Sequence, residues 1–348
     1  MNVTDVSSLL PIINKSELPP VDKARATALA LNYPSQWENF DGNIVATEME
    51  LKVEMKDCND WVLAGIIDTL AERDGEYIMI EHKTRSGDVD NVGDGYYRRL
   101  AHDMQITMYH ILLECNGFPV EQTIYDVVRK LTTLCRRIPA GKMGDENPKI
   151  GSRVEMCRLG SYHGMQLDGK DLAWLAAYME KLAVDDTLEP LKESPKLYGL
   201  RMAVAIAERP EKYFKQYGQI RRSYEEVEHA LAGLRQVCQQ IDATDPTDLA
   251  VWPMNTAQCN SYGTACEFMD VCAGVQDING DQYQDRKQRS GPKELSHSKL
   301  CSYHGCKRKY HYRYNVGKEH VRQRAPALEF GSVMHLYFAA YFDMKKGK

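Results

Sequence analysis

GIIDTLAERDGEYIMIEHK, residues 65–83, is the part of this chain that best predicts its fold. It predicts a β-hairpin, because a mostly apolar segment at 62–70 is followed by the turn signal Asp74-Gly75 and a second apolar run at 77–80. The first strand carries one acid, Asp68, and the second strand ends in Glu81-His82-Lys83. Three charged groups are therefore expected together at one end of a small sheet.

These three charges predict a metal site. Glu81 and Lys83 share a face of their strand, because residues two apart point the same way. Charges there are costly unless they are paired or bind a metal. Two carboxylates are suitable ligands for Mg²⁺ or Mn²⁺, and a lysine can orient a water or offset the charge of a phosphate. The alternative is that Asp68 and Glu81 lie at strand ends and pair with surface lysines.

A helix predicted around 101–115 adds two polar residues, Gln105 and Tyr109, which lie on one helix face because they are four residues apart. Three motifs stand out: Gly65-x-x-Asp68, Glu81-x-Lys83 and Gln105-x-x-x-Tyr109. Together they resemble the PD-(D/E)XK nuclease superfamily and, within it, the RecB-like and CRISPR-adaptation exonuclease branch. The resemblance implies an α/β fold with a restriction-endonuclease-like core. That core is a mixed central sheet flanked by helices, with an added helical region and an iron–sulfur subdomain.

Further elements are expected on either side of the hairpin. A helix is predicted at 21–31, and strands are predicted at 44–55 and 123–131. The loop at 84–98 is rich in Gly and Asp and could border the substrate path. Glu48, in the strand at 44–55, is either an additional acid near the site or a solvent-facing residue, and we favour the solvent-facing position.

The middle of the chain is predicted to be mainly helical, and its helices carry no candidate catalytic or metal-binding residues. Amphipathic helices are predicted at 171–182 and 223–241, the second opening with a capping box of Ser223 and Glu226. Residues 200–213 are expected to continue this helical layer, and 138–165 to form an irregular insertion.

Composition indicates an ordinary soluble protein. The 348 residues are 43% hydrophobic and 27% charged, which is enough for one large or two modest domains. No apolar run is long enough for a transmembrane helix, and the first residues do not resemble a secretory signal, so a cytoplasmic location without a membrane partner is expected. The net charge of −5 excludes a global attraction to DNA, so any nucleic-acid site must be a local patch.

One such patch occurs at 304–324, where seven Lys and Arg stand against one Glu and alternate with tyrosines. Cations for phosphates and aromatic rings for bases suit single-stranded nucleic acid. The alternative is a solvated basic face. The predicted nucleic-acid-binding residues are Lys307, Arg308, Lys309, Tyr310 and Arg313.

Three of the ten cysteines, Cys259, Cys266 and Cys272, are clustered in the sequence. Spacings of seven and six positions in a Gly- and Asn-containing loop suggest a metal site, and three thiolates need a fourth ligand. Zinc accepts four cysteines, and so does an iron–sulfur cluster. The alternative is that these cysteines are unrelated to each other.

The C-terminal segment extends the resemblance. ELSHSKLCSYHGCKRKYHYRY, residues 294–314, resembles the segment that opens RecB-like nuclease domains, and it implies Cys306 as the fourth ligand of a 4Fe-4S cluster. Gly331-x-x-x-His335 at a helix start is similar to the metal-binding histidine motif of that family. The alternative for His335 is a core histidine.

In the family both of these elements precede the acidic residues, whereas here they follow the three cysteines. The chain is therefore interpreted as a circularly permuted single nuclease domain, 1–348. A truncated tandem repeat is less consistent with the sequence, because 1–45 contain no histidine. The rotated order leaves open exchange of parts between two chains, and thus a homo-oligomer. The predicted divisions are a catalytic core at 44–130, a helical region at 131–258, an iron–sulfur subdomain at 259–272 plus 295–324, a linker at 274–294 and a histidine helix at 328–343.

The resemblance implies a metal-dependent DNA exonuclease. Asp68, Glu81, His335 and the main-chain carbonyl of His82 are expected to hold Mg²⁺ or Mn²⁺, Lys83 to position or polarise the attacking water, and Gln105 and Tyr109 to hold the lysine strand and the DNA path. Single-stranded DNA or DNA ends are the expected substrates, in recombination, repair, CRISPR adaptation or a phage programme. The expected partner is a separate helicase, recombinase or CRISPR integration protein. The alternative is a catalytically weak nucleic-acid-binding module with a nuclease-like fold.

Overall fold

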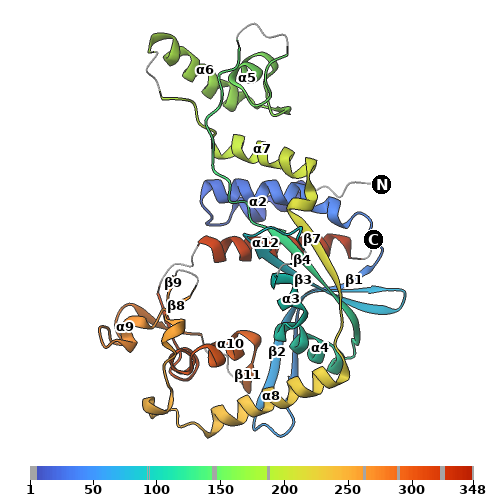
Figure 1. Ribbon diagram of the computed structural model, residues 1–348, viewed down its shortest axis with the longest axis vertical. Coiled ribbons are helices and arrows are strands. Elements are labelled where there is room, and N and C mark those ends of the chain that lie inside the picture. The colour runs from blue at the N-terminus through green and yellow to red at the C-terminus, as the bar shows by residue number, and fades with distance from the viewer. Residues whose placement is uncertain are drawn as a thin grey trace.

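The computed structural model describes residues 6–91, 93, 95–142, 147–185, 189–261, 264–287, 291–321 and 326–346. At the centre of this described part lies a six-stranded mixed sheet with helices on both of its faces (Figure 1). Five of its strands follow in the order β1 (Asn43–Glu54), β2 (Trp61–Arg73), β3 (Glu76–Arg85), β4 (Val120–Arg129) and β7 (Phe214–Ile220), and β11 (Lys293–Leu295) pairs with β2.

The predicted hairpin forms the middle of this sheet. β1, β2 and β3 are antiparallel neighbours, and the turn between β2 and β3 has positive φ at Asp74 (56°) and Gly75 (83°). Asp-Gly is favoured in such turns because both residues tolerate the left-handed region. β3 and β4 are parallel, and α3 (Gly95–Ala101) and α4 (Met104–Cys115) form the crossover between them.

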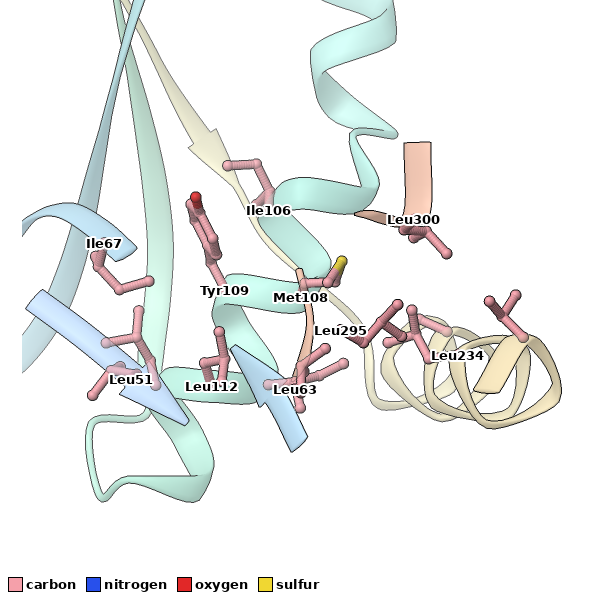
Figure 2. Close-up of a cluster of buried hydrophobic side chains, with 14 of the residues drawn as sticks. Leu51, Leu63, Ile67, Ile106, Met108, Tyr109, Leu112, Leu234, Leu295 and Leu300 are labelled. Carbon is pink, nitrogen blue, oxygen red and sulfur yellow. The ribbon is translucent and has the colours of Figure 1, made fainter. Parts of the chain in front are cut away.

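Two apolar cores lie on opposite faces of the sheet, because alternate residues of β3 point to opposite sides. Ile78 and Ile80 belong to one core, with α2 (Pro20–Asn32), α7 (Pro195–Glu208) and α12 (Pro326–Lys345). Met79 belongs to the other core, with α4, α8 (Tyr224–Ala243) and α10 (His297–Gly305). Figure 2 shows this second core, where side chains of β2, α4, α8 and β11 meet. The C-terminal segment is therefore part of the same core as the hairpin.

The first helices of the described chain lie beside its last helix. The 3₁₀ turn η1 (Val6–Leu9), α1 (Leu10–Asn14) and α2 all contact α12. α12 in turn contacts β1, β2 and β3, so elements from both ends of the sequence cover the hairpin.

Two smaller units flank the sheet. One has its own apolar cluster and stands at the top of Figure 1; it contains α5 (Arg153–Leu159), β5 (Ser161–Tyr162), β6 (Met165–Gln166) and α6 (Gly169–Val184). The other is built from short segments around Phe268, Tyr283 and Tyr312. It contains β8 (Asn260–Ser261), β9 (Thr264–Ala265), α9 (Met269–Cys272), β10 (Tyr283–Asp285), α11 (Lys307–Tyr310), the π-helical turn η6 (His311–Asn315) and β12 (Lys318–His320). The remaining 3₁₀ turns are η2 (Tyr33–Trp37), η3 (Pro210–Lys212), η4 (Leu249–Val251) and η5 (Thr256–Gln258).

The predicted α/β fold with a mixed central sheet and flanking helices is confirmed. The capping box of Ser223 and Glu226 opens α8 as expected. None of the helices in the described ranges is both long and apolar enough to cross a membrane.

Several local predictions differ from the structure. The helical layer expected at 200–213 ends with α7 at Glu208, and β7 follows and pairs with β4. α3 begins inside the predicted loop at 84–98, and the insertion at 138–165 contains α5 and a short hairpin. The predicted linker at 274–294 contains β10 and the start of β11; its residues 288–290, like 322–324 of the basic patch, lie outside the described residues.

Candidate active site

The charged residues of the hairpin gather where β2 and β3 separate. Pairing between these strands ends at Thr69 and Ile80, and Asp68 and Glu81 occupy the next position on each strand. Beyond this point β2 continues beside β1 and β3 continues beside β4. The strands thus diverge at the two acids, and their carboxylates face the opening.

Glu81 is buried in this opening, and one of its two carboxylate oxygens accepts a hydrogen bond. Its side chain is 2% exposed, Oε1 accepts from Lys83 Nζ at 2.7 Å, and Oε2 has no hydrogen-bond partner among the described residues. Burial raises the pKa of Glu81 to about 7, and the charge of Asp68 adds to the shift. Two carboxylates this close repel each other when both are ionised, which favours a cation between them.

Asp68 is held from two sides. The main-chain N–H of His82 donates to its Oδ2 at 2.8 Å, and Nδ1 of His335 lies 3.6 Å from the same oxygen. Burial raises the pKa of Asp68, but the two histidines lower it by more than burial raises it, so the pKa is lower than usual. Burial lowers the pKa of His335, but Asp68 raises it more. Each residue thus favours the charged form of the other, and α12 brings His335 to the hairpin.

Lys83 connects the acids to α4. Its Nζ donates to Glu81 and, at 2.7 Å, to Oε1 of Gln105, whose Nε2 donates to the hydroxyl of Tyr109 at 2.8 Å. Burial lowers the pKa of Lys83, but the charge of Glu81 and the hydrogen bond to it raise it above the usual value. Lys83 is thus a fixed ammonium group, and the structure brings together Asp68, Glu81, Lys83, Gln105, Tyr109 and His335.

Gly65 has a steric reason to be glycine. A Cβ at this position would lie 2.8 Å from both Cε1 of Tyr109 and Cδ1 of Leu112, so α4 packs directly against the strand backbone. Figure 2 shows the Tyr109 ring beside this core, with its hydroxyl oxygen pointing away from Leu112. The glycine of the sequence motif therefore sets how close Tyr109 comes to the acids.

Glu48 is exposed on β1, in line with the solvent-facing position that the sequence interpretation favoured, and it lies beside the strand that carries Asp68. Its β1 neighbours Thr47 and Met49 pair with Thr69 and Ile67, so Glu48 is level with Asp68. Burial raises the pKa of Glu48, and the charge of Asp68 adds to the rise. Its φ of 47° lies in the left-handed region, which is uncommon for a residue with a side chain. Glu48 is thus solvent-exposed, as the favoured interpretation has it, and it also lies level with an acid of the site.

A buried polar network behind Glu81-His82-Lys83 was not anticipated from the sequence. Oδ2 of Asp126 accepts from the hydroxyl of Tyr33 and lies 2.9 Å from Nδ1 of His82. The His82 ring stacks on Phe342 of α12, and its Nε2 lies 3.4 Å from the Thr69 hydroxyl. Because the ring is fixed, the His82 main chain that holds Asp68 is fixed as well. The available signal was an acid, Asp126, inside the apolar strand predicted at 123–131.

A divalent cation suits the donors of this site. Among the residues that the structure describes, no three carboxylate, imidazole or thiolate groups lie close enough together to hold one ion as they stand. The buried, unpartnered oxygen of Glu81 and its repulsion with Asp68 nevertheless fit a cation, which would satisfy the oxygen and offset the repulsion. His335 and the acids are also the ligand types that Mg²⁺ or Mn²⁺ accept.

The four predicted ligand cysteines, Cys259, Cys266, Cys272 and Cys306, line one small cavity. Burial raises the pKa of Cys272 to about 11, and the neighbouring thiols of the other three add to the shift. The main-chain N–H of Asn255 donates to Cys306 Sγ at 3.4 Å. Four cysteines are the donor types of a zinc ion or an iron–sulfur cluster, but no three of the described thiols lie close enough together to hold a single ion as they stand.

The predicted nucleic-acid-binding residues have partners within the protein. The Tyr310 ring is 2% exposed and stacks on Trp252, and Nε of Arg308 donates to the Trp252 carbonyl at 2.6 Å. Both Arg313 and Lys309 face Glu267, at 2.7 and 3.9 Å. Lys307 lies over the Tyr303 ring. These contacts hold the turn after Cys306 against the cysteine loop, and the nucleic-acid role of these residues stays a prediction.

Comparison with known proteins adds one match. A family model described as the PD-(D/E)XK nuclease superfamily matches residues 16–273 and 294–348. A search of curated proteins and a search of solved structures each returned no match.

Proposed function

The chain belongs to the PD-(D/E)XK nuclease superfamily, and from this we propose that it is a metal-dependent exonuclease that hydrolyses phosphodiester bonds of single-stranded DNA or DNA ends. The observation that carries the proposal is the arrangement of Glu81. Its buried carboxylate lies beside Asp68 and has one oxygen on Lys83, whereas the other oxygen has no partner in the part of the chain that the structure describes. A site with that one oxygen unsatisfied is prepared for a cation.

Asp68, Glu81, His335 and the main-chain carbonyl of His82 would hold Mg²⁺ or Mn²⁺, with Glu48 as an additional nearby acid. The bound cation supplies Lewis-acid stabilisation of the phosphate and a more acidic water. The pKa shift of Glu81 implies that this acid must lose its proton before it can serve as a ligand.

Lys83 supplies a positive charge at a fixed place. Because Glu81 and Gln105 hold its ammonium group from two sides, it can donate to the attacking water or to a phosphate oxygen without first being ordered. Tyr109 in turn orients Gln105, so α4 sets the position of the lysine. We assign Lys83 to stabilisation of the negative charge that develops on the phosphate.

We also propose that Cys259, Cys266, Cys272 and Cys306 bind a 4Fe-4S cluster, with zinc as the alternative. In support, the four thiols line one cavity although Cys306 follows Cys272 by a long intervening segment. The group would join that segment to the cysteine loop and add stability rather than transfer electrons.

The branch and the order of the chain are part of the proposal. We place the chain in the RecB-like branch as a circular permutation of one domain. We take the rotated order from the order of the sequence motifs; the family match to 16–273 and 294–348 and the packing of α12 on α1 and α2 are compatible with it. No Gly-x-x-x-x-Gly-Lys-Ser/Thr motif occurs in the sequence, so unwinding in recombination, repair or CRISPR adaptation would require a separate partner.

Cleavage of end-labelled DNA by anaerobically purified protein tests the proposal. With Mg²⁺ or Mn²⁺ the protein should shorten labelled single strands or ends, and Lys83→Ala should cut at least about 100-fold more slowly while still binding DNA. The exposed Lys56→Ala is the matched control and should cut normally. Binding without cleavage by the wild-type protein would instead establish the binding-module alternative, and cleavage by Lys83→Ala at the wild-type rate would refute the assignment of Lys83.

A further inference from the structure

A cavity of about 710 Å³ opens beside the candidate active site. Gly65, Gln105 and Tyr109 form one wall of it. Gln105 accepts a hydrogen bond from Lys83 and donates one to Tyr109, which packs against Gly65. The other wall comes from the C-terminal part of the chain, at 286–287, 291–294, 296–299, 313–315 and 317. A molecule in this cavity would therefore lie between the acidic hairpin and a segment that the sequence suggested was a linker.

The other wall is cationic and aromatic. The cavity lining contains five cations, Arg286, Lys287, Lys293, Lys299 and Arg313, against two acids, Glu50 and Glu294. Because the whole chain carries a net charge of −5, this concentration of cations is local. Cations beside an enzyme site that handles phosphodiesters provide the electrostatic contacts that polyanions need.

Lys299 is the cation best placed to take a phosphate. Its Nζ donates to the main-chain carbonyl of Glu294 at 2.8 Å and lies over the rings of Trp61 and Tyr314, at 5.8 and 5.3 Å from their centroids. Among the described residues, the Lys299 ammonium group thus contacts a neutral carbonyl and two rings, whereas Lys293 is paired with Asp242 at 2.6 Å. Burial also lowers the pKa of Lys299, which is consistent with an ammonium group that has lost part of its water.

Tyr314 brings an aromatic face to the same wall. Arg286 lies 4.8 Å from the centroid of its ring, on which Lys299 also lies, and Nε of Arg286 is 3.4 Å from Oε2 of Glu319. Cations for the backbone and an aromatic ring for a base are the combination that binds single-stranded nucleic acid without regard to sequence. The cavity volume falls in the range of pockets that hold one small ligand, roughly 300–1,000 Å³, which suits a short piece of one strand rather than a duplex.

We propose that this cavity is the binding site for a single DNA strand, with Lys299 and Arg286 on its phosphates and Tyr314 on a base. The proposal rests on the proposed nuclease function, because it places the strand next to Lys83 and Glu81. It assigns substrate binding to Lys299, Arg286 and Tyr314 rather than to Arg308 and Tyr310, which pack against Trp252.

The test is binding of a fluorescent single-stranded oligonucleotide, and of the same sequence as a blunt duplex, without divalent metal and over a range of salt concentrations. Lys299→Ala should weaken single-strand binding about tenfold and reduce the slope of log affinity against log salt by about 0.7. Lys299→Arg should restore both, Tyr314→Leu should weaken single-strand binding with little change of slope, and duplex binding should change little. Lys299→Gln, which keeps a donor for the Glu294 carbonyl, serves if Lys299→Ala does not fold. The exposed Lys170→Ala, on α6, is the matched control.

An unchanged single-strand affinity and salt slope in a folded Lys299→Ala or Lys299→Gln protein would overturn the proposal. Because binding is measured without metal, this outcome is separate from the nuclease assay. If the wild-type protein cuts DNA while these variants bind normally, the proposed nuclease function stands and the proposed binding site is refuted. If the wild-type protein binds single strands through Lys299 but does not cut DNA, the proposed binding site stands and the proposed nuclease function is refuted.

Discussion

The main-chain N–H of His82 donates to Oδ2 of Asp68 at 2.8 Å, across the point where their two strands separate. One residue of the Glu81-His82-Lys83 motif thus fixes the carboxylate of the neighbouring strand, while its side chain points to the other face of the sheet. There its ring meets Asp126 and Phe342. The position of the candidate metal ligands therefore depends on buried contacts that touch neither metal nor DNA.

Asp126→Ala should impair cleavage without touching the site. It removes the shared acceptor of Tyr33 and His82 and leaves two buried donors unsatisfied, at a cost of about 1–3 kcal/mol each in the free energy of unfolding. We expect kcat to fall roughly tenfold to a hundredfold, because the His82 main chain loosens around Asp68. Tyr33→Phe removes one donor and should have a smaller effect on both quantities. A folded Asp126→Ala protein with wild-type kcat would show that the network does not position the site.

Glu81→Gln should change how stability depends on pH in metal-free protein. The pKa of Glu81 is raised from 4.5 to about 7 on folding, so its contribution is present below about pH 4.5 and is lost as the pH rises through about 7. Between pH 5 and pH 8 in EDTA, the wild-type protein should therefore lose stability relative to Glu81→Gln. Denaturant unfolding at the two pH values measures the difference, and a pH-independent difference would contradict the shift.

Magnesium should reverse that loss at pH 8. A cation that binds the ionised Glu81 stabilises the folded state of the wild-type protein, and it should stabilise Glu81→Gln less. The comparison uses the same unfolding measurement with and without Mg²⁺. Equal stabilisation of both proteins would place the bound ion elsewhere.

Gly65→Ala should displace α4. The added Cβ meets Tyr109 and Leu112 at 2.8 Å, so the helix must shift or the core must strain, at about 1–3 kcal/mol in the free energy of unfolding. Cleavage should also fall, because Tyr109 holds Gln105 against Lys83. Gly218→Ala on β7 is the matched control, since its Cβ would meet only Ile124, at 3.9 Å. Equal behaviour of the two variants would refute the role given to the close packing.

Cys306→Ala should remove the metal centre of the cysteine cavity. We expect loss of the brown colour, of the bound iron and of much of the soluble yield in anaerobic preparations, because the remaining three thiols cannot complete the ligand set. Cys115→Ala, at an exposed cysteine, should keep the iron. Metal and sulfide analysis decides between the candidates. A colourless wild-type protein with one zinc ion would establish the zinc alternative, and iron retained by Cys306→Ala would exclude this cysteine as a ligand.

The sequence predicted the hairpin and the meeting of Asp68, Glu81 and Lys83, because turn chemistry and strand alternation act over short distances. It also predicted that Gln105 and Tyr109 share a helix face. Helical spacing alone could not place that face against the strand of Lys83, which only the resemblance to a known family implied, and the packing of Tyr109 on Gly65 comes from the structure.

Other parts of the site depend on contacts between distant segments. Tyr33 and Asp126 are 93 residues apart, and no local pattern joins them. Glu48 reads as an ordinary strand residue until pairing with β2 brings it level with Asp68. The basic segment after Cys306 looked like a solvent-facing DNA patch, because composition does not reveal that Trp252 and Glu267 engage its side chains.

The contact between His335 and Asp68 can form only late in the synthesis of the chain. The two residues are 267 positions apart, so at translation rates of about 5–20 residues per second a growing chain carries both acids for roughly 15–50 s before the histidine is made. α12, which supplies this histidine, also covers the hairpin and stacks on the His82 ring. A ribosome-bound intermediate would thus lack the final arrangement of the site, and cutting activity would be withheld until synthesis has passed α12.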